Sequence, residues 1–179
     1  MHHAFVFALV AVSLSAVALA AGESPYVGQE KRGIKALSEQ EIADYLKGAG
    51  MGSSKAAELN HYPGPRHVLD AAQGLALTPE QQKATQALMD EMHSRATRVG
   101  EQIVAKEAEL DKLFASSSAD ANGIRRVVTD LSVLQAEFRL AHLDAHLATR
   151  DVLSAEQIAK YDTLRGYGGE ASGEHKHHH

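Results

Sequence analysis

The sequence has 179 residues, a formal net charge of −5 and no cysteine. The lack of cysteine excludes disulfides, thiolate metal sites and cysteine nucleophiles. The acidic balance argues against a nucleic-acid-binding protein, which would carry a basic stripe. Aromatic residues are few and tryptophan is absent, so we expect one domain whose core consists mainly of Leu, Ala, Val and Ile.

The N-terminus has the pattern of a signal peptide. Residues 4–21 are apolar except for two serines, and Ala18-Leu19-Ala20 supplies the small residues that signal peptidase requires. We expect residues 1–20 to be removed and the remaining chain to be periplasmic. The alternative is an uncleaved N-terminal anchor, because no positive residue precedes the apolar run, and about 18 apolar residues can just span a bilayer.

Residues 21–64 are expected to form an N-terminal arm with short helices. The segment 23–37 shows no periodicity and should be extended. Ser38 and Glu41 have the spacing of a capping box, which predicts the start of a short helix. A second short helix is predicted up to Leu59, and the arm ends in a turn rich in Pro and Gly.

Two copies of one short motif lie in the region 65–167. Leu77-Thr78-Pro79-Glu80-Gln81 recurs as Leu153-Ser154-Ala155-Glu156-Gln157. In each copy a hydroxyl residue precedes a glutamine by three positions, so that each side chain can bond to the other residue's backbone N–H at a helix start. The predicted capping pairs are Thr78 with Gln81 and Ser154 with Gln157.

Apolar residues between the two motifs recur at helical spacing. They predict one long amphipathic helix over residues 79–115 and a second that ends near Arg150, with a turn at residues 116–120. Two long helices joined by a short loop should lie antiparallel, because this arrangement buries both apolar stripes. Short helices are predicted before the hairpin, over residues 66–73, and after it, over residues 155–164. The predicted fold class is therefore all-α, a long antiparallel helical hairpin with short flanking N- and C-terminal helices.

The twin motifs behind a secretory leader resemble the LTXXQ-motif family of periplasmic Spy/CpxP-like proteins, which has zinc-resistance and heavy-metal-sensor relatives. The resemblance covers about residues 65–167, with Ser154 in place of the usual Thr. It implies a Spy/CpxP-like fold and ATP-independent chaperone activity, in which hairpins pair into a curved homodimer that holds unfolding client proteins. It also implies divalent heavy-metal binding in the sensor relatives.

The hairpin register predicts a group of metal-ligating side chains at its open end. His142 and His146 are four residues apart and therefore project from one face of the second helix. With the turn centred near Ala119, His146 should face Met92 and His93 across the hairpin, and His142 should face Ala96. His67 on the preceding short helix can fold back onto this end of the hairpin. Such side chains bind Zn²⁺, Ni²⁺ or Cu²⁺. The alternative is that His142 is a hydrogen-bonded core histidine and His93 points to solvent.

The C-terminus, residues 168–179, is expected to be a disordered tail that can chelate divalent metal with low selectivity. Its predicted ligands are His175, His177, His178 and His179. An expression tag is the alternative interpretation of this run.

Several apolar positions fall at or beyond the edge of the hairpin seam and are candidates for a client or dimer surface. These are Leu88, Met89, Val104, Val133, Leu140, Leu143 and Leu147. The alternative is that they pack against the N-terminal helices. Gly100 should lie opposite Phe138, and either makes room for that ring, lies at a bend, or is an exposed helical glycine.

No catalytic motif is present, neither a nucleophile elbow nor a phosphate-binding glycine loop, so we expect no enzymatic activity and no nucleotide cofactor. The leading hypothesis is a periplasmic envelope-stress protein that binds divalent metal, unfolded clients or both, and acts as a homodimer. The rival is a membrane-anchored heavy-metal sensor that signals to a membrane partner. A third possibility is a plain structural helical domain without a ligand.

Overall fold

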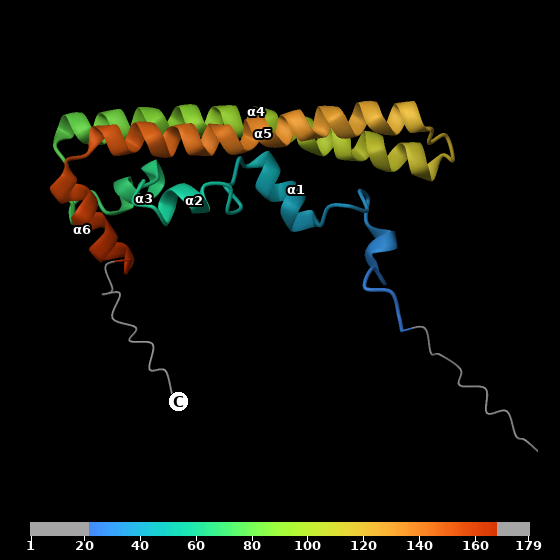
Figure 1. Cartoon of the computed structure of the whole chain (residues 1–179), viewed down its shortest axis with the longest axis horizontal. Coiled ribbons are helices and arrows are strands. Elements are labelled where there is room, and N and C mark those ends of the chain that lie inside the picture. Colours follow the sequence, from blue (N-terminus) through green and yellow to red (C-terminus); the bar gives the residue numbers. More distant parts are fainter. Residues whose placement is uncertain (1–21, 168–179) are drawn as a thin grey trace, which may run out of the picture.

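The computed structural model describes residues 22–167 (Figure 1). In chain order its elements are the 3₁₀ helix η1 (Gln29–Lys31) and the α-helices α1 (Glu39–Leu46), α2 (Lys55–Glu58), α3 (Pro65–Asp70), α4 (Pro79–Ala115), α5 (Ala121–Val152) and α6 (Ala155–Arg165). The described residues are helical and contain no strand, which confirms the predicted all-α class. The predicted signal peptide and the predicted His-rich tail lie outside the described residues.

The long helices α4 and α5 lie side by side and antiparallel, as predicted (Figure 1). Asp120 begins α5 by accepting hydrogen bonds from the backbone N–H groups of Asn122 and Gly123, which have no partner inside the helix. Ion pairs cross the hairpin between Arg95 and Asp144 at 2.7 Å and between Lys106 and Asp130 at 3.0 Å. Both pairs fit the predicted register closely.

The main core lies along the α4–α5 seam. Its buried residues are Ala96, Val99, Ile103, Val127, Leu131, Phe138 and Ala141. Two residues of the apolar helical pattern, Phe114 and Val128, are instead exposed. Consecutive residues differ in direction by about 100° on a helix, so a seam centred on Val127 turns Val128 toward solvent.

The N-terminal arm covers one side of the hairpin, where α1, α2 and α3 follow one another along α4 and α5 (Figure 1). The expectation that residues 23–37 are extended was wrong, since this segment contains turns and η1. α1 begins at Ser38 with the predicted capping box, in which Glu41 accepts from the Ser38 backbone N–H at 2.8 Å. α3 ends at Asp70, earlier than expected.

Gly100 is buried at the point where the end of α1 crosses α4. A Cβ atom at this position would overlap the carbonyl oxygen of Tyr45 and lie 2.7 Å from its carbonyl carbon. The missing side chain thus makes room for the α1 backbone. The interpretation that it makes room for the Phe138 ring was wrong. Phe138 packs edge-on against the Tyr45 ring instead, with ring centroids 5.3 Å apart.

The twin motifs meet at the open end of the hairpin. Both capping boxes are formed as predicted, and the side-chain amides of Gln81 and Gln157 also bond to each other, with N···O distances of 2.8 and 3.0 Å. The motif leucines Leu77 and Leu153 are buried beside them in a second core with Tyr161. The repeated motif therefore joins two helix starts that are far apart in the sequence.

We expect the glutamine pair to be coupled energetically. Gln81→Ala and Gln157→Ala should each lower the free energy of unfolding by about 1–2 kcal/mol, because each variant loses a helix cap and the partly buried bonds between the two amides. The double variant should lose less than the sum of the two, by about 1 kcal/mol, since the second replacement removes a bond already broken. Urea denaturation measures all three. Gln86→Ala, which changes a surface residue of α4, is the control, and strict additivity would contradict the coupling.

Candidate metal-binding pocket

A pocket of about 390 Å³ lies between the open half of the hairpin, the start of α3 and the segment 47–50 after α1. All five residues predicted as metal ligands at the open end of the hairpin line it: His67, Met92, His93, His142 and His146. The structure therefore brings the predicted group to one place. The arm contributes the wall opposite the hairpin, which the sequence did not predict.

His142 is buried, with 4% of its surface exposed, between the Phe138 ring and Gly50. Its Nε2 atom is buried and has no hydrogen-bond partner among the described residues. Burial, and then repulsion from His146, lowers the pKa of His142 to about 4. The ring is neutral at pH 7 and keeps a lone pair. Because Nε2 makes no hydrogen bond, His142 differs from the hydrogen-bonded core histidine of the alternative prediction.

His146 is held in one orientation by the arm. Its Nδ1 lies 2.7 Å from the carbonyl oxygen of Tyr62. A carbonyl oxygen only accepts, so Nδ1 carries a proton and donates it, which leaves Nε2 as the nitrogen that could bind a metal ion. The ring packs closely on Gly64, where an added Cβ would lie 2.7 Å from Nε2. Metal-ligating histidines are usually fixed in this way, by a backbone carbonyl or a carboxylate on the other nitrogen.

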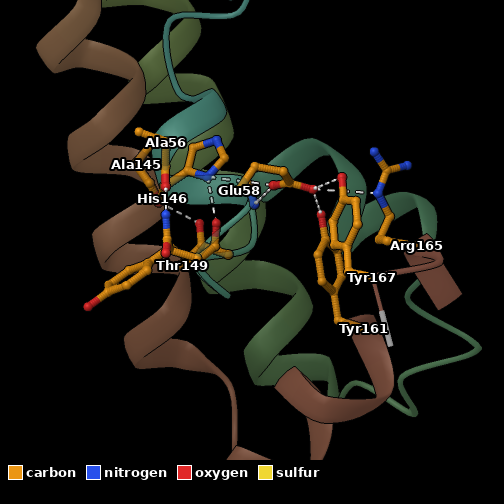
Figure 2. A network of polar contacts seen from close by, with 11 residues as sticks. Ala56, Glu58, Ala145, His146, Thr149, Tyr161, Arg165 and Tyr167 are labelled. Atoms are coloured by element: carbon orange, nitrogen blue, oxygen red, sulfur yellow. Dashed lines mark hydrogen bonds and ion pairs between the residues drawn. The ribbon is translucent and has the colours of Figure 1, made fainter. Parts of the chain in front are cut away.

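Glu58 at the end of α2 connects this histidine to the C-terminal helix (Figure 2). One carboxylate oxygen accepts from the hydroxyls of Tyr161 at 2.5 Å and Tyr167 at 3.3 Å and lies 3.5 Å from Nε of Arg165. The other accepts from the Gly64 N–H at 3.3 Å and lies 3.7 Å from Nδ1 of His146. Burial raises the pKa of Tyr161, which keeps its hydroxyl protonated as a donor.

Sequence reasoning missed Glu58 because it lies in a four-residue helix within a segment that has no recognisable motif. Its partners are more than eighty positions away, apart from Gly64. The aromatic residues Tyr161 and Tyr167 near the C-terminus were the one signal of a buried polar partner, since buried tyrosine hydroxyls usually find one.

The remaining pocket residues differ in exposure. Met92 and its neighbour Met89 are half-buried, whereas His93 is exposed. His67 is half-buried, and its Nδ1 lies 3.7 Å from a carboxylate oxygen of Asp70. Within residues 22–167, no three His, Asp or Glu side chains form a group that could hold a metal ion. His142 and His146 therefore need further donors, which the pocket offers as thioethers.

The predicted client or dimer positions fall into two groups. Val133, Leu140 and Leu147 on α5 are exposed, at 53%, 46% and 53%. Leu88, Met89, Val104 and Leu143 are half-buried. In the part of the chain that the structure describes, no helix has the length and apolar character needed to cross a membrane.

The sequence of this chain is similar to those of known proteins. Residues 46–160 match the heavy-metal resistance family. The signaling pathway modulator ZraP of Salmonella typhimurium is 29% identical over 117 residues, which are 65% of this chain and 74% of the relative. ZraP of Escherichia coli O6:H1 is 30% identical over 99 residues, 55% and 68% of the two chains.

A zinc resistance-associated protein homolog of Nitratidesulfovibrio vulgaris is 30% identical over 74 residues, which are 40% of this chain and 43% of the relative. No solved structure matches. The family match covers both motif leucines and both histidines of α5, and it begins at Leu46, before the region that carried the resemblance in the sequence. The chain belongs to the heavy-metal resistance family.

Proposed function

We propose that this chain is a periplasmic, non-enzymatic protein of the envelope stress response that binds a heavy-metal ion through His142 and His146. The buried, unpaired Nε2 of His142 is the observation that carries the proposal. Leaving a polar atom buried without a partner is costly, and a ligand that accepts its lone pair would offset that cost.

The pocket residues fit a metal ion on two further counts. His142 and His146 lie one helical turn apart and line the same pocket. The orientation of His146 is fixed, because its Nδ1 donates to the carbonyl of Tyr62, which leaves Nε2 as its metal-binding nitrogen. The names of the relatives refer to a signalling pathway and to zinc resistance, and the second name supports association with a metal.

Metal titration by calorimetry tests the proposal. The protein should be the full chain with His175, His177, His178 and His179 replaced by alanine, so that the tail cannot bind. His142→Ala and His146→Ala should each weaken binding of Zn²⁺, Ni²⁺ or Cu²⁺ by at least about tenfold, since one ligand is lost.

His61→Ala is the matched control, because His61 is exposed and pairs with Asp162 outside the pocket. Unchanged metal affinity in both pocket variants would overturn the proposal.

A second candidate function is chaperone-like binding of unfolded clients by a homodimer. Val133, Leu140 and Leu147 recur every seven residues on α5, so they form one exposed apolar line along the helix. A line of this kind suits a second copy of the chain or the apolar segment of an unfolding protein. A partner in a signalling pathway, as in the anchored-sensor hypothesis, would use the same face.

Replacing Leu140 and Leu147 by glutamine should convert a dimer to a monomer in light scattering and abolish suppression of client aggregation, because an exposed apolar contact is removed. Leu164→Gln is the control, since Leu164 is also 53% exposed but lies on α6. An unchanged mass together with undiminished suppression would exclude this surface.

The anchored-sensor hypothesis differs from the main proposal at the N-terminus, which lies outside the described residues. N-terminal sequencing of the exported protein separates the two. A sequence that starts at Ala21 supports the periplasmic protein, and retention of Met1 supports the anchored form.

A further inference from the structure

We propose that the pocket prefers a soft monovalent ion, Cu(I), held by the imidazoles of His142 and His146 together with thioether sulfur from Met89 and Met92. This inference rests on the proposed function and specifies the ion. It departs from the divalent ions that the sequence suggested.

The placement of the methionines is the first argument. The chain has four methionines, and two of them, Met89 and Met92, line this one pocket with the histidines. They are three residues apart on α4 and therefore lie on one face of that helix. The sequence assigned Met89 to a client surface, whereas the structure places it in the pocket wall. Thioethers are soft ligands that select Cu(I) over harder divalent ions.

The charge of the pocket is the second argument. Its lining side chains carry imidazole and thioether groups, which are neutral donors, and the cations of Lys47 and Arg66. A divalent ion held by neutral donors would keep its double charge beside those two exposed cations, since the Glu58 carboxylate near His146 is already paired with Arg165. A monovalent ion meets about half of that repulsion.

The supply of donors is the third argument. Zn²⁺ is almost always held by four ligands in structural sites. The described residues provide no cluster of three His, Asp or Glu at this pocket or elsewhere. Cu(I) has a filled d shell and can be held by a small number of neutral ligands. It can therefore use sulfur from the half-buried methionines on the facing helix.

Methyl NMR with Ag(I), a redox-stable analogue of Cu(I), tests the inference directly. The sample is the full chain with ¹³C-methyl methionine and alanine at the four tail histidines. One equivalent of Ag(I) should shift the methyl signals of Met89, Met92 or both. The methyl of Met51, which lies in a different pocket, is the internal reference and should not move. Loss of the shifts in the His142→Ala/His146→Ala variant would place sulfur and imidazole on one ion.

Competition with a chromophoric Cu(I) chelator under anaerobic, reducing conditions gives the affinity. Met89→Leu/Met92→Leu should weaken Cu(I) binding at least about tenfold and change Zn²⁺ binding less than about twofold. Met51→Leu should change neither. Leucine replaces methionine at nearly constant volume, so the variants should fold, and circular dichroism checks this.

The outcomes separate this inference from the proposed function. If Zn²⁺ binding requires His142 and His146 while Cu(I) binding is unaffected by the methionine variants, the Cu(I) inference is wrong and the proposed function stands. If no metal depends on the two histidines, both are wrong. If the methionine methyls stay fixed on Ag(I) addition, the thioethers are not ligands and the inference is overturned.

Discussion

Replacing Gly100 by alanine is expected to lower the free energy of unfolding by about 3 kcal/mol, at the upper end of the range for overpacked sites. The new Cβ would overlap the carbonyl oxygen of Tyr45, which belongs to the backbone and cannot rotate away. The end of α1 must therefore move off α4, and the edge contact between Tyr45 and Phe138 would be lost with it. Urea or thermal denaturation followed by circular dichroism measures the effect.

Gly123→Ala is the matched control for Gly100→Ala. Gly123 is also a buried glycine of a long helix, but its Cβ would meet only side-chain atoms at ordinary contact distances, those of Asp120 at 3.4 Å and of Leu113 at 3.8 Å. Alanine has the higher helix propensity, so this change should raise stability by about 0.5 kcal/mol or leave it unchanged. The free energies of unfolding of the two glycine variants should thus differ by at least about 3 kcal/mol. Equal effects would mean that α1 does not pack on α4 at Gly100.

Removing the carboxylate of Glu58 is expected to be the second large effect. Glu58→Ala should destabilise the protein by about 3 kcal/mol, because the fully buried Tyr161 loses its acceptor and the Gly64 N–H loses its own. The guanidinium of Arg165 and the hydroxyl of Tyr167 also lose their shared partner. Chemical denaturation gives the loss, and protease sensitivity of the C-terminal helix shows whether α6 detaches.

Two further variants identify the cause of the Glu58 effect. Tyr161→Phe removes the donor and should cost less than Glu58→Ala, because the carboxylate keeps its remaining partners. Glu101→Ala changes an exposed glutamate of α4 and should stay within about 0.5 kcal/mol of the parent. A Glu58→Ala protein as stable as the Glu101→Ala control would contradict the assigned network.

The helix starts and the hairpin were predictable from the sequence because they depend on local chemistry. Ser38, Thr78 and Ser154 each cap a helix with a residue three positions later, so the capping boxes follow from spacing alone. The apolar periodicity and the short loop fix the antiparallel pairing and its register, which also brought His142 and His146 opposite Met92. Packing, however, decided which face of each long helix is buried, since Val128 lies next to the seam and is exposed.

The arm was decided only by the tertiary structure. Residues 22–64 have weak periodicity, and their positions depend on contacts with residues far along the chain, such as Tyr45 on Gly100 and Glu58 on Tyr161. Sequence spacing cannot predict such contacts, because any of several faces of the hairpin could accept a short helix. The arm closes the pocket and fixes His146 through Tyr62. The sequence by itself thus determined where the helices lie and which histidines share a face, whereas long-range packing determined the tautomer of His146, the burial of His142 and the methionines beside them.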